Sequence, residues 1–422
     1  MSGVAGTEFP LTYGTVSYAS GGYVALPVII QGGMGVQVSS WKLARKVSQA
    51  GQLGVVSGTA LDLVVARRLQ DGDPSGDIRR AISHFPLRDM AERVLKRYFI
   101  EGGRPQNKPY VPVPTISLAP HQNAIDIQVV GNFVEVFLAK ENHDGVIGIN
   151  FLEKVQMATP LAAYGAMLAN VDYVLMGAGI PAEIPQLLNH LARHEKFSLA
   201  VDVEEATSKY FIDIDPQAIS GGTLPPLKRP TFLAIVSAHV LAAFLAKDAA
   251  TRPDGFVIEG PTAGGHNTPP RSKEIDENGE PVFGPRDEAD LVKVAATGLP
   301  FWLAGGRSTP ELIREAIASG AQGVQVGTVF ALSEDSGFTP HYRNLLRSGI
   351  SDGTLYVKTD RLASPTGFPF KVAQLQETVS NNEIYEARPR LCDLGYLRAP
   401  YERSPGVVGY RCPSEPIDMY IK

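Results

Sequence analysis

The sequence predicts an α/β protein built on a (β/α)8 barrel, the TIM-barrel fold. Short apolar runs alternate with helical patterns along most of the chain, eight of these runs suit barrel strands, and several end in glycine-rich turns. An open, doubly wound parallel sheet is the runner-up. The strand count and the two glycine turns that end the last two strands favour the barrel.

The composition of the 422-residue chain is that of an ordinary globular protein. Hydrophobic residues make up 44% of it and charged residues 20%. This excludes a disordered chain, a coiled coil and a collagen-like repeat. The formal net charge is −5, so no basic excess exists to neutralise phosphates, and no nucleic-acid partner is expected.

The cysteines and the ends of the chain bear on its location. Cys392 and Cys412 are too few to staple a protein of this size, so we expect reduced thiols in a cytoplasmic protein. A disulfide or metal role for this pair is the alternative, but no Cys-x-x-Cys occurs and no metal site is predicted. Residues 1–22 lack the basic region of a signal peptide. The longest apolar stretch, 231–246, is too short to span a bilayer, so no membrane partner is expected.

The first part of the barrel is assigned to residues 1–72. Its first strand, 27–31, runs into a glycine turn, and Ser39 or Ser40 is expected to cap the next helix, which Gly51 ends. The same rhythm of strand, turn and helix identifies the later strands. The expected barrel strands are residues 27–31, 53–57, 145–151, 173–176, 232–236, 255–259, 301–304 and 323–326.

Three segments do not follow the alternation of strands and helices that a barrel requires. Residues 73–144 are a mostly helical insertion that covers one side of the barrel or contacts a second copy in a homo-oligomer. The remainder of the barrel, 145–348, contains an inserted hairpin at about 196–230, because two more barrel strands would overfill the count. Residues 349–422, rich in proline, arginine and aromatics, are a C-terminal extension that wraps the barrel.

Two consecutive strands end in turns suited to a phosphate. Gly305 and Gly306 follow the seventh strand and lead to a helix, and Gly327 and Thr328 follow the eighth. Glycine lets backbone amides approach an anion, and barrel enzymes often hold phosphate at these two loops. Plain tight turns are the alternative reading.

The first and third strands end in residues suited to a flat ring. Gly33 and Met34 lie in a turn with little side-chain bulk, and Asn150 offers an amide donor and acceptor. The phosphate could belong to a substrate or to FMN. A Rossmann dinucleotide site is not indicated, because the chain has no G-x-G-x-x-G run.

His266 is the candidate catalytic residue. It follows two glycines after the sixth strand and precedes a polar stretch of about twenty residues that could act as a lid. An imidazole there could remove a carbon-bound proton or orient a substrate. A structural histidine is the alternative.

These motifs together resemble the nitronate monooxygenase family, also called 2-nitropropane dioxygenase-like proteins, which is related to the flavin-dependent enoyl-ACP reductases. The most telling pieces are Ala-Gly-Gly-His at 263–266, Ala-Gly-Gly at 304–306 and Gly-Val-Gln-Val-Gly-Thr at 323–328. The turn Ala-Gly-Gln-Leu-Gly at 50–54 and Gly-Ile-Asn at 148–150 add to the resemblance. It covers about residues 27–330, apart from the two insertions.

The resemblance implies an FMN flavoprotein whose active-site histidine is His266. The residues implied to hold the cofactor are Gly33, Met34, Asn150, Gly265, Gly305, Gly306, Gln325, Gly327 and Thr328. The chain departs from well-known monooxygenases at Gly32-Gly33, where they read Ala-Pro, and at Asn267, where many carry arginine. A distinctive tail segment, 361–368, could fold back towards the site.

Three functions stay open on the sequence. The first is a monooxygenase that oxidises a small nitronate or nitroalkane, with O2 as the oxidant of the flavin. The second is an NAD(P)H-dependent flavin enoyl reductase of a lipid or polyketide pathway. The third is a non-catalytic relative that binds FMN or phosphate. Dehydrogenase chemistry of the inosine-monophosphate type is disfavoured, because no cysteine lies near a barrel strand end.

Overall fold

The computed structural model describes residues 15–17, 23–222, 224–364, 367–389, 392 and 394–412. Its centre is an eight-stranded parallel sheet in the order β3-β12-β11-β10-β9-β6-β5-β4. Parallel pairing of Ile30 with Leu53 joins the first and last strands of this order, with two backbone hydrogen bonds of 2.9 and 3.1 Å beside it. The sheet is therefore a closed barrel, and the predicted fold is confirmed.

The barrel strands lie where the sequence predicts them. Residues 255–259, 301–304 and 323–326 match their predicted bounds, and the other strands begin and end within two residues of theirs. Buried parallel strands are near-continuous apolar runs, which is why they stand out in the sequence. The strands are β3 (Ile29–Gln31), β4 (Gly54–Ser57), β5 (Ile147–Leu152), β6 (Tyr173–Gly177), β9 (Thr231–Val236), β10 (Gly255–Glu259), β11 (Phe301–Ala304) and β12 (Gly323–Val326).

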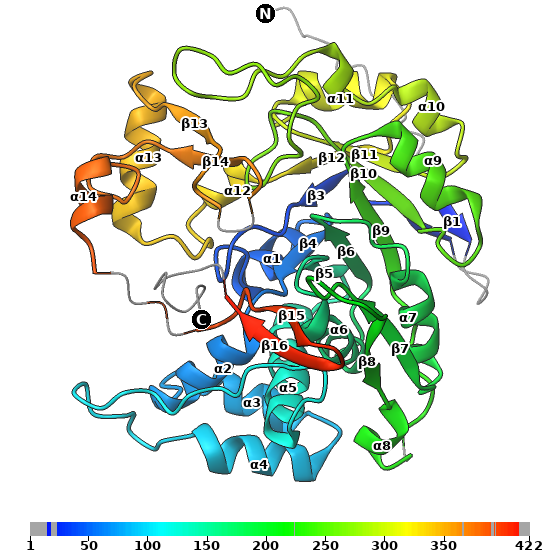
Figure 1. Cartoon of the computed structure of the whole chain (residues 1–422), viewed down its shortest axis with the longest axis vertical. Coiled ribbons are helices and arrows are strands. Elements are labelled where there is room, and N and C mark those ends of the chain that lie inside the picture. The colour runs from blue at the N-terminus through cyan, green and yellow to red at the C-terminus, as the bar shows by residue number, and fades with distance from the viewer. Residues whose placement is uncertain are drawn as a thin grey trace, which may run out of the picture.

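Helices surround the barrel, and Figure 1 shows them outside the strands. Those within the predicted barrel segments are α1 (Trp41–Gln49), α2 (Leu61–Gln70), α6 (Thr159–Leu168), α7 (Ile184–Ala192), α8 (Pro216–Ser220), α9 (His239–Lys247), α10 (Leu291–Ala295), α11 (Pro310–Ala318), α12 (Thr328–Ala331) and most of α13 (Pro340–Ser351). Two short 3-10 helices, η1 (Gln156–Ala158) and η2 (Pro285–Asp287), lie in loops.

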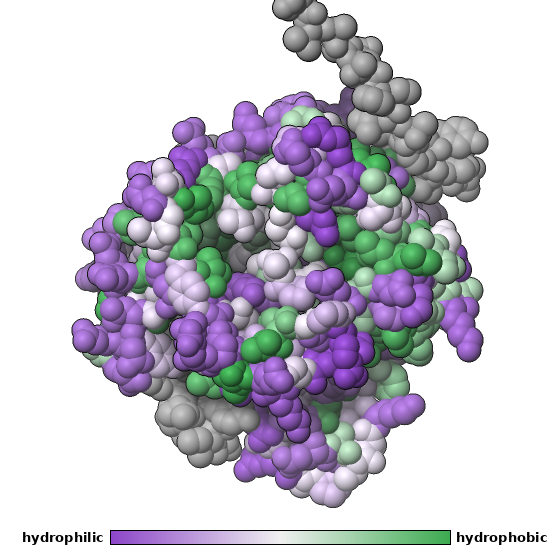
Figure 2. Space-filling view, turned by 90° about the horizontal axis from the view of Figure 1, so that it is seen from above, coloured by the Kyte–Doolittle hydropathy of each residue, from purple (hydrophilic) through white to green (hydrophobic). Residues whose placement is uncertain are grey.

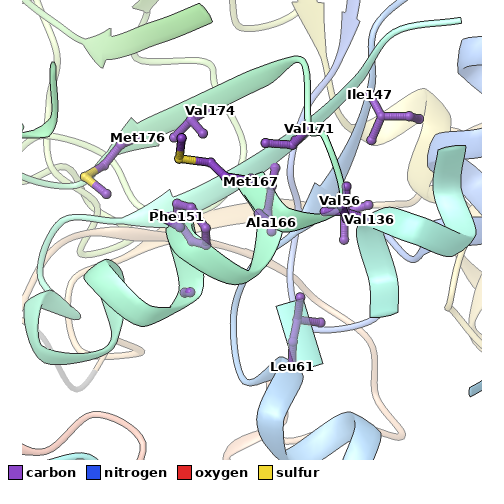
Figure 3. Close-up of a cluster of buried hydrophobic side chains, with 14 of the residues drawn as sticks. Val56, Leu61, Val136, Ile147, Phe151, Ala166, Met167, Val171, Val174 and Met176 are labelled. Atoms are coloured by element: carbon purple, nitrogen blue, oxygen red, sulfur yellow. The ribbon is translucent and has the colours of Figure 1, made fainter. Parts of the chain in front are cut away.

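Two hydrophobic layers hold the barrel together. Side chains that point inward from alternate strand positions, such as Ile30, Val55, Leu175 and Trp302, fill its interior. A larger cluster packs the outer faces of the strands against the helices, and Figure 3 shows part of it around β5, β6 and α6. The interior is thus a packed core, which leaves the carboxyl-end loops as the place for a site.

The start of α1 differs from the expectation. Ser40 occupies the N-cap position of this helix, but its side chain makes no capping hydrogen bond. Instead, the backbone N–H of Trp41 donates to Oε2 of the buried Glu135, at 3.2 Å. Ser39 braces the turn after β3: its hydroxyl donates to the Gly32 carbonyl at 3.1 Å and accepts from the Met34 N–H at 2.9 Å. A carboxylate distant in sequence therefore accepts the hydrogen bond at the start of α1 that a local serine side chain was expected to accept.

The segment 73–144 is largely helical, with α3 (Asp77–Ser83), α4 (Arg88–Tyr98) and α5 (Gln122–Lys140). The helix α5 is buried on nearly every side, because it packs against α1, α2, α4 and α6. Gly165 of α6 permits one of these contacts, since a Cβ there would lie 2.2 Å from the Val129 carbonyl oxygen. This part of the chain therefore covers one side of the barrel (Figure 1).

The expected hairpin is present as β7 (Phe197–Val201) and β8 (Tyr210–Ile214), which pair antiparallel. The C-terminal extension contributes β13 (Val357–Asp360), β14 (Phe370–Ala373), α14 (Asn382–Ala387), β15 (Ala399–Ser404) and β16 (Val407–Arg411). Its last hairpin docks beside β7 and β8, where Glu204 and Tyr401 form a parallel bridge (Figure 1). A short antiparallel pair, β1 (Thr15–Ser17) and β2 (Tyr23–Ala25), precedes the barrel.

The cysteines, the helices and the surface complete the description. Cys392 and Cys412 are free thiols. None of the helices in the described part of the chain is long and apolar enough to cross a membrane. Hydrophilic residues cover much of the face seen in Figure 2, with hydrophobic groups between them. Residues 1–14 and 413–422, which belong to the predicted first and last segments, lie outside the described residues.

Candidate active site

The loops after β3, β5 and β12 meet at the carboxyl end of the barrel. Gly33 lies so close to Asn150 that a Cβ on this glycine would be 2.3 Å from the Asn150 Cβ. A Cβ on Gly327 would lie 3.8 Å from the Met34 side chain. Four predicted cofactor residues, from the carboxyl end of β5 and from the turns after β3 and β12, are therefore neighbours in space. Closed barrels bring strand ends together in this way.

Amide side chains at this end of the barrel carry unused hydrogen-bonding groups. Oε1 of Gln325 is buried with no hydrogen-bond partner among the described residues, and Gln325 packs against Gly32. The buried Asn150 makes one long contact, from Nδ2 to the Phe151 carbonyl at 3.4 Å. An unsatisfied buried polar atom costs about 1–3 kcal/mol. These amides therefore suit the polar edge of a bound ring.

The turn after β11 has the backbone geometry of an anion site. Gly305 and Gly306 adopt φ values of 110° and 66°, which favour glycine. A Cβ on Gly305 would lie 2.7 Å from Oγ1 of Thr262, so the loops after β10 and β11 are in contact. In the described part of the chain, the amides of Gly305, Gly306 and Gly327 donate no backbone hydrogen bond. Free backbone amides in such glycine turns can receive a phosphate.

Two other predicted cofactor residues make fewer contacts with the rest of the candidate site. Thr328 is exposed and begins α12, which has only four residues. Gly265 lies beside His266 in the loop after β10, and its carbonyl accepts a hydrogen bond from the Lys371 N–H at 2.9 Å. Their roles toward a cofactor stay predictions.

His266 is half-buried at the carboxyl end of the barrel. Its Nε2 lies 2.9 Å from Oγ of Ser364, and the Phe370 ring packs edge-on against the imidazole at 4.7 Å between centroids. Burial, followed by the positive charge of Lys154, lowers the pKa of His266 to about 4. The imidazole is therefore neutral at physiological pH and able to accept a proton.

The tail segment does fold back over His266, as the sequence analysis expected. Asn267 donates its N–H to the Pro369 carbonyl at 2.8 Å, and His266 forms an antiparallel bridge with Phe370. Residues 365–366 of this segment lie outside the described residues. The extension thus supplies part of the wall around the candidate catalytic side chain.

Two ionisable residues near the strand ends were missed by sequence reasoning. Glu259, the last residue of β10, lines a small cavity of about 90 Å3 with Asn267 and Arg286, and burial raises its pKa to about 7. Lys154 follows β5, and burial lowers its pKa to about 8. The position of Glu259 at a strand end is a signal in the sequence, but its desolvation is visible only in the fold.

The comparison with protein families matches one part of the chain. Residues 226–361 match the family model of nitronate monooxygenase. This part of the chain contains His266 and both glycine turns, and the match confirms the resemblance there. The match indicates an oxidoreductase that is similar to nitronate monooxygenase over these residues.

Solved structures give more distant likenesses. FabK from Thermotoga maritima is 17% identical, with a TM-score of 0.45, over 86% of this chain and 76% of that chain. A nitroalkane oxidase from Streptomyces ansochromogenes is 17% identical, with a TM-score of 0.41, over 82% and 76%. The enoyl reductase domain of MlnA from Bacillus amyloliquefaciens is 12% identical, with a TM-score of 0.43, over 87% and 69%. At these TM-scores the alignments do not bear on the reaction. No curated protein matches the chain.

Proposed function

We propose that this protein binds FMN and oxidises a small nitronate or nitroalkane, with O2 as the oxidant of the flavin. One structural observation supports this most directly. The loop of residues 260–267 carries the neutral His266 and also packs Thr262 against the glycine turn at Gly305. The candidate proton acceptor and the candidate phosphate turn are therefore parts of one rigid arrangement.

The residues at the barrel mouth fit FMN. The free amides of Gly305, Gly306 and Gly327 would hold the phosphate, and Asn150 and Gln325 would meet the polar edge of the ring. Gly33 and Met34 would lie against the ring, with Gly265 and Thr328 as further contacts. When bound, the flavin supplies the electron acceptor for substrate oxidation.

His266 has the properties of a base toward a carbon-bound proton. Its Nε2 is engaged by Ser364, whereas Nδ1 has no hydrogen-bond partner in the described part of the chain. The tautomer with its proton on Nε2 donates to the serine hydroxyl and leaves the Nδ1 lone pair for a substrate.

Anaerobic stopped-flow spectroscopy of the purified protein tests the proposal. Ethylnitronate or nitroethane should change the visible flavin spectrum rapidly, and admission of O2 should restore it. If NAD(P)H bleaches the flavin quickly and the nitro compounds do not, the enoyl reductase is the correct function. A colourless protein that takes up no FMN after incubation would favour the non-catalytic relative.

Location and assembly are part of the same proposal. The cytoplasm is proposed because the cysteine usage fits a reducing compartment. A homo-oligomer through residues 73–144 is proposed as well, and light scattering on the eluted protein would establish its mass.

A further inference from the structure

A second cavity lies at the carboxyl end of the barrel, beside the loops after β5 and β6, and Lys154, whose charge acts on His266, is part of its wall. Its volume is about 360 Å3. Its walls come from the start of α2, the loop and 3-10 helix after β5, the inserted segment at 113–116 and the C-terminal extension at 394–400. Two of these walls belong to the insertion and the extension, so the cavity exists only because both fold against the barrel.

About half of the side chains that line this cavity are apolar, and its rim also carries the charged Glu153, Lys154, Asp202, Glu204 and Arg398. The apolar ones include Leu63, Val113, Ile116, Met157, Ala158 and Phe368. The volume is more than twice that of the ~150 Å3 engineered cavity that binds benzene, and it falls in the usual range of small-molecule sites. Such a space suits a flexible chain of roughly eight to ten carbons.

Two polar side chains that line the same cavity have unused hydrogen-bonding atoms. Oδ1 of Asp62 and both terminal atoms of Gln128 are buried with no hydrogen-bond partner among the described residues. Asp62 is 6% exposed and Gln128 is 1% exposed. Leaving such atoms unsatisfied costs about 1–3 kcal/mol each. A ligand that both donates and accepts hydrogen bonds would recover this cost.

We propose that this cavity binds an apolar chain of about eight to ten carbons that ends in an uncharged amide or hydroxyl group, with the polar end at Asp62 and Gln128. A carboxylate end is disfavoured, because the Asp62 carboxylate would repel it. Nε of Arg398 is also buried without a partner, but the guanidinium already donates to Oγ1 of Thr115 and stacks on Tyr410. It is therefore less available to receive an anion.

The probes are octanamide and octanoate, titrated by calorimetry at pH 8 into the full-length protein. Octanamide should bind at least tenfold more tightly than octanoate. Gln128→Leu keeps the volume and removes the amide, so it should weaken octanamide binding about tenfold. Val113→Trp fills the cavity from the inserted segment and should abolish binding of both probes.

The controls separate this proposal from loss of folding and from the flavin proposal. Val292→Trp changes an exposed valine of α10 and should bind octanamide as the unaltered protein does. Thermal melting and flavin content are measured for every variant. The readout is the heat of binding and not turnover, so the cavity proposal does not rest on the proposed reaction.

Three results would overturn the proposal. These are no octanamide binding to the unaltered protein, octanoate binding as tight as octanamide, or octanamide binding that survives Val113→Trp in a folded protein. Retained tight binding in Gln128→Leu would contradict the assigned place of the polar end.

Discussion

At the scale of single residues, the chemistry depends on how the fold desolvates a few ionisable groups. Glu259 is the last residue of β10, and His266 lies seven residues further along, in the loop that follows. Burial moves their pKa values in opposite senses, to about 4 for the imidazole and about 7 for the carboxyl. In both cases burial favours the uncharged form. At neutral pH the imidazole is therefore uncharged, and the carboxyl group is close to its own pKa.

Replacing His266 tests its assignment as the base. His266→Ala should keep the flavin bound and slow oxidation of nitroethane by roughly 10²–10⁴-fold, because a general base contributes about that much. Flavin absorbance and anaerobic reduction rate are the measurements. His341→Ala, which removes a surface histidine paired with Glu377, is the control and should leave the rate unchanged. Unaltered turnover in His266→Ala would reduce this residue to a structural role.

Glu259 makes stability depend on pH in a direction that can be worked out. Its pKa is raised from 4.5 to about 7 in the folded protein, so the folded state binds the proton more tightly than the unfolded state. Stability therefore falls as the pH rises from about 4.5 to 7, and the loss persists above that range. Glu259→Gln should raise the free energy of unfolding by about 1–3 kcal/mol at pH 8 and change it little at pH 4.5.

Urea denaturation at the two pH values measures this difference. Glu277→Gln, at an exposed position of the following loop, should show no such gain at pH 8. An equal effect of Glu259→Gln at both pH values would mean that the carboxyl is not desolvated in the folded protein.

At the scale of elements, strand ends and the turns after them decide where a cofactor can lie. The turn after β11 needs left-handed backbone at two successive glycines, and it contacts the loop after β10. The turn after β3 is held by the Ser39 hydroxyl, which bonds on both sides of Gly33. These contacts pre-organise the backbone before any ligand binds.

Adding bulk to the turn after β11 should remove the cofactor. Gly306→Val places a branched side chain where the backbone would approach a phosphate, and its φ of 66° strains any such residue. We expect loss of stoichiometric FMN, measured by absorbance after desalting. Gly320→Val is the matched control, because this glycine has a φ of 93° and open space around it, beyond the end of α11. If both variants retain FMN equally, the phosphate lies elsewhere.

At the scale of the whole molecule, the C-terminal extension joins distant parts of the chain. Glu402 of β15 accepts hydrogen bonds from the Thr207 N–H and the Tyr210 hydroxyl, both at 2.6 Å, and from the Gly406 N–H at 3.0 Å. These bonds lower the pKa of Glu402 to about 2. The extension is thus fastened to the β7–β8 hairpin on one side and covers His266 on the other.

Removing this carboxylate should loosen the extension selectively. Glu402→Ala should speed hydrogen exchange in residues 399–411 and 204–210 and leave exchange in the barrel strands unchanged, because the barrel core makes no use of this group. In the unaltered protein the same loosening should appear as the pH falls from about 4.5 to 2, where the folded carboxylate becomes protonated. Glu386→Ala on the exposed side of α14 is the control. Equal exchange in Glu402→Ala and the unaltered protein would show that other contacts hold the extension.

The fold and the position of the candidate site were largely predictable, for a local reason. Buried parallel strands are short apolar runs, and the turns after them need glycine, so both leave a signal within a few residues. The helical insertion and the hairpin were recognisable because they interrupt the regular alternation of barrel strands and helices. Gly33, Asn150 and Gln325 were singled out one by one, and the closed barrel brings them together.

Other features depend on contacts between residues far apart in the chain, and no local pattern records these. The Glu135 side chain caps α1 in place of that of Ser39 or Ser40, Ser364 and Phe370 surround His266, and Asp62 and Gln128 line a cavity closed by the extension. Local residue types thus set the barrel and its turns. The packing of remote segments set which groups lose water, and with it their pKa values and the shape of the second cavity, because desolvation depends on every neighbour in space.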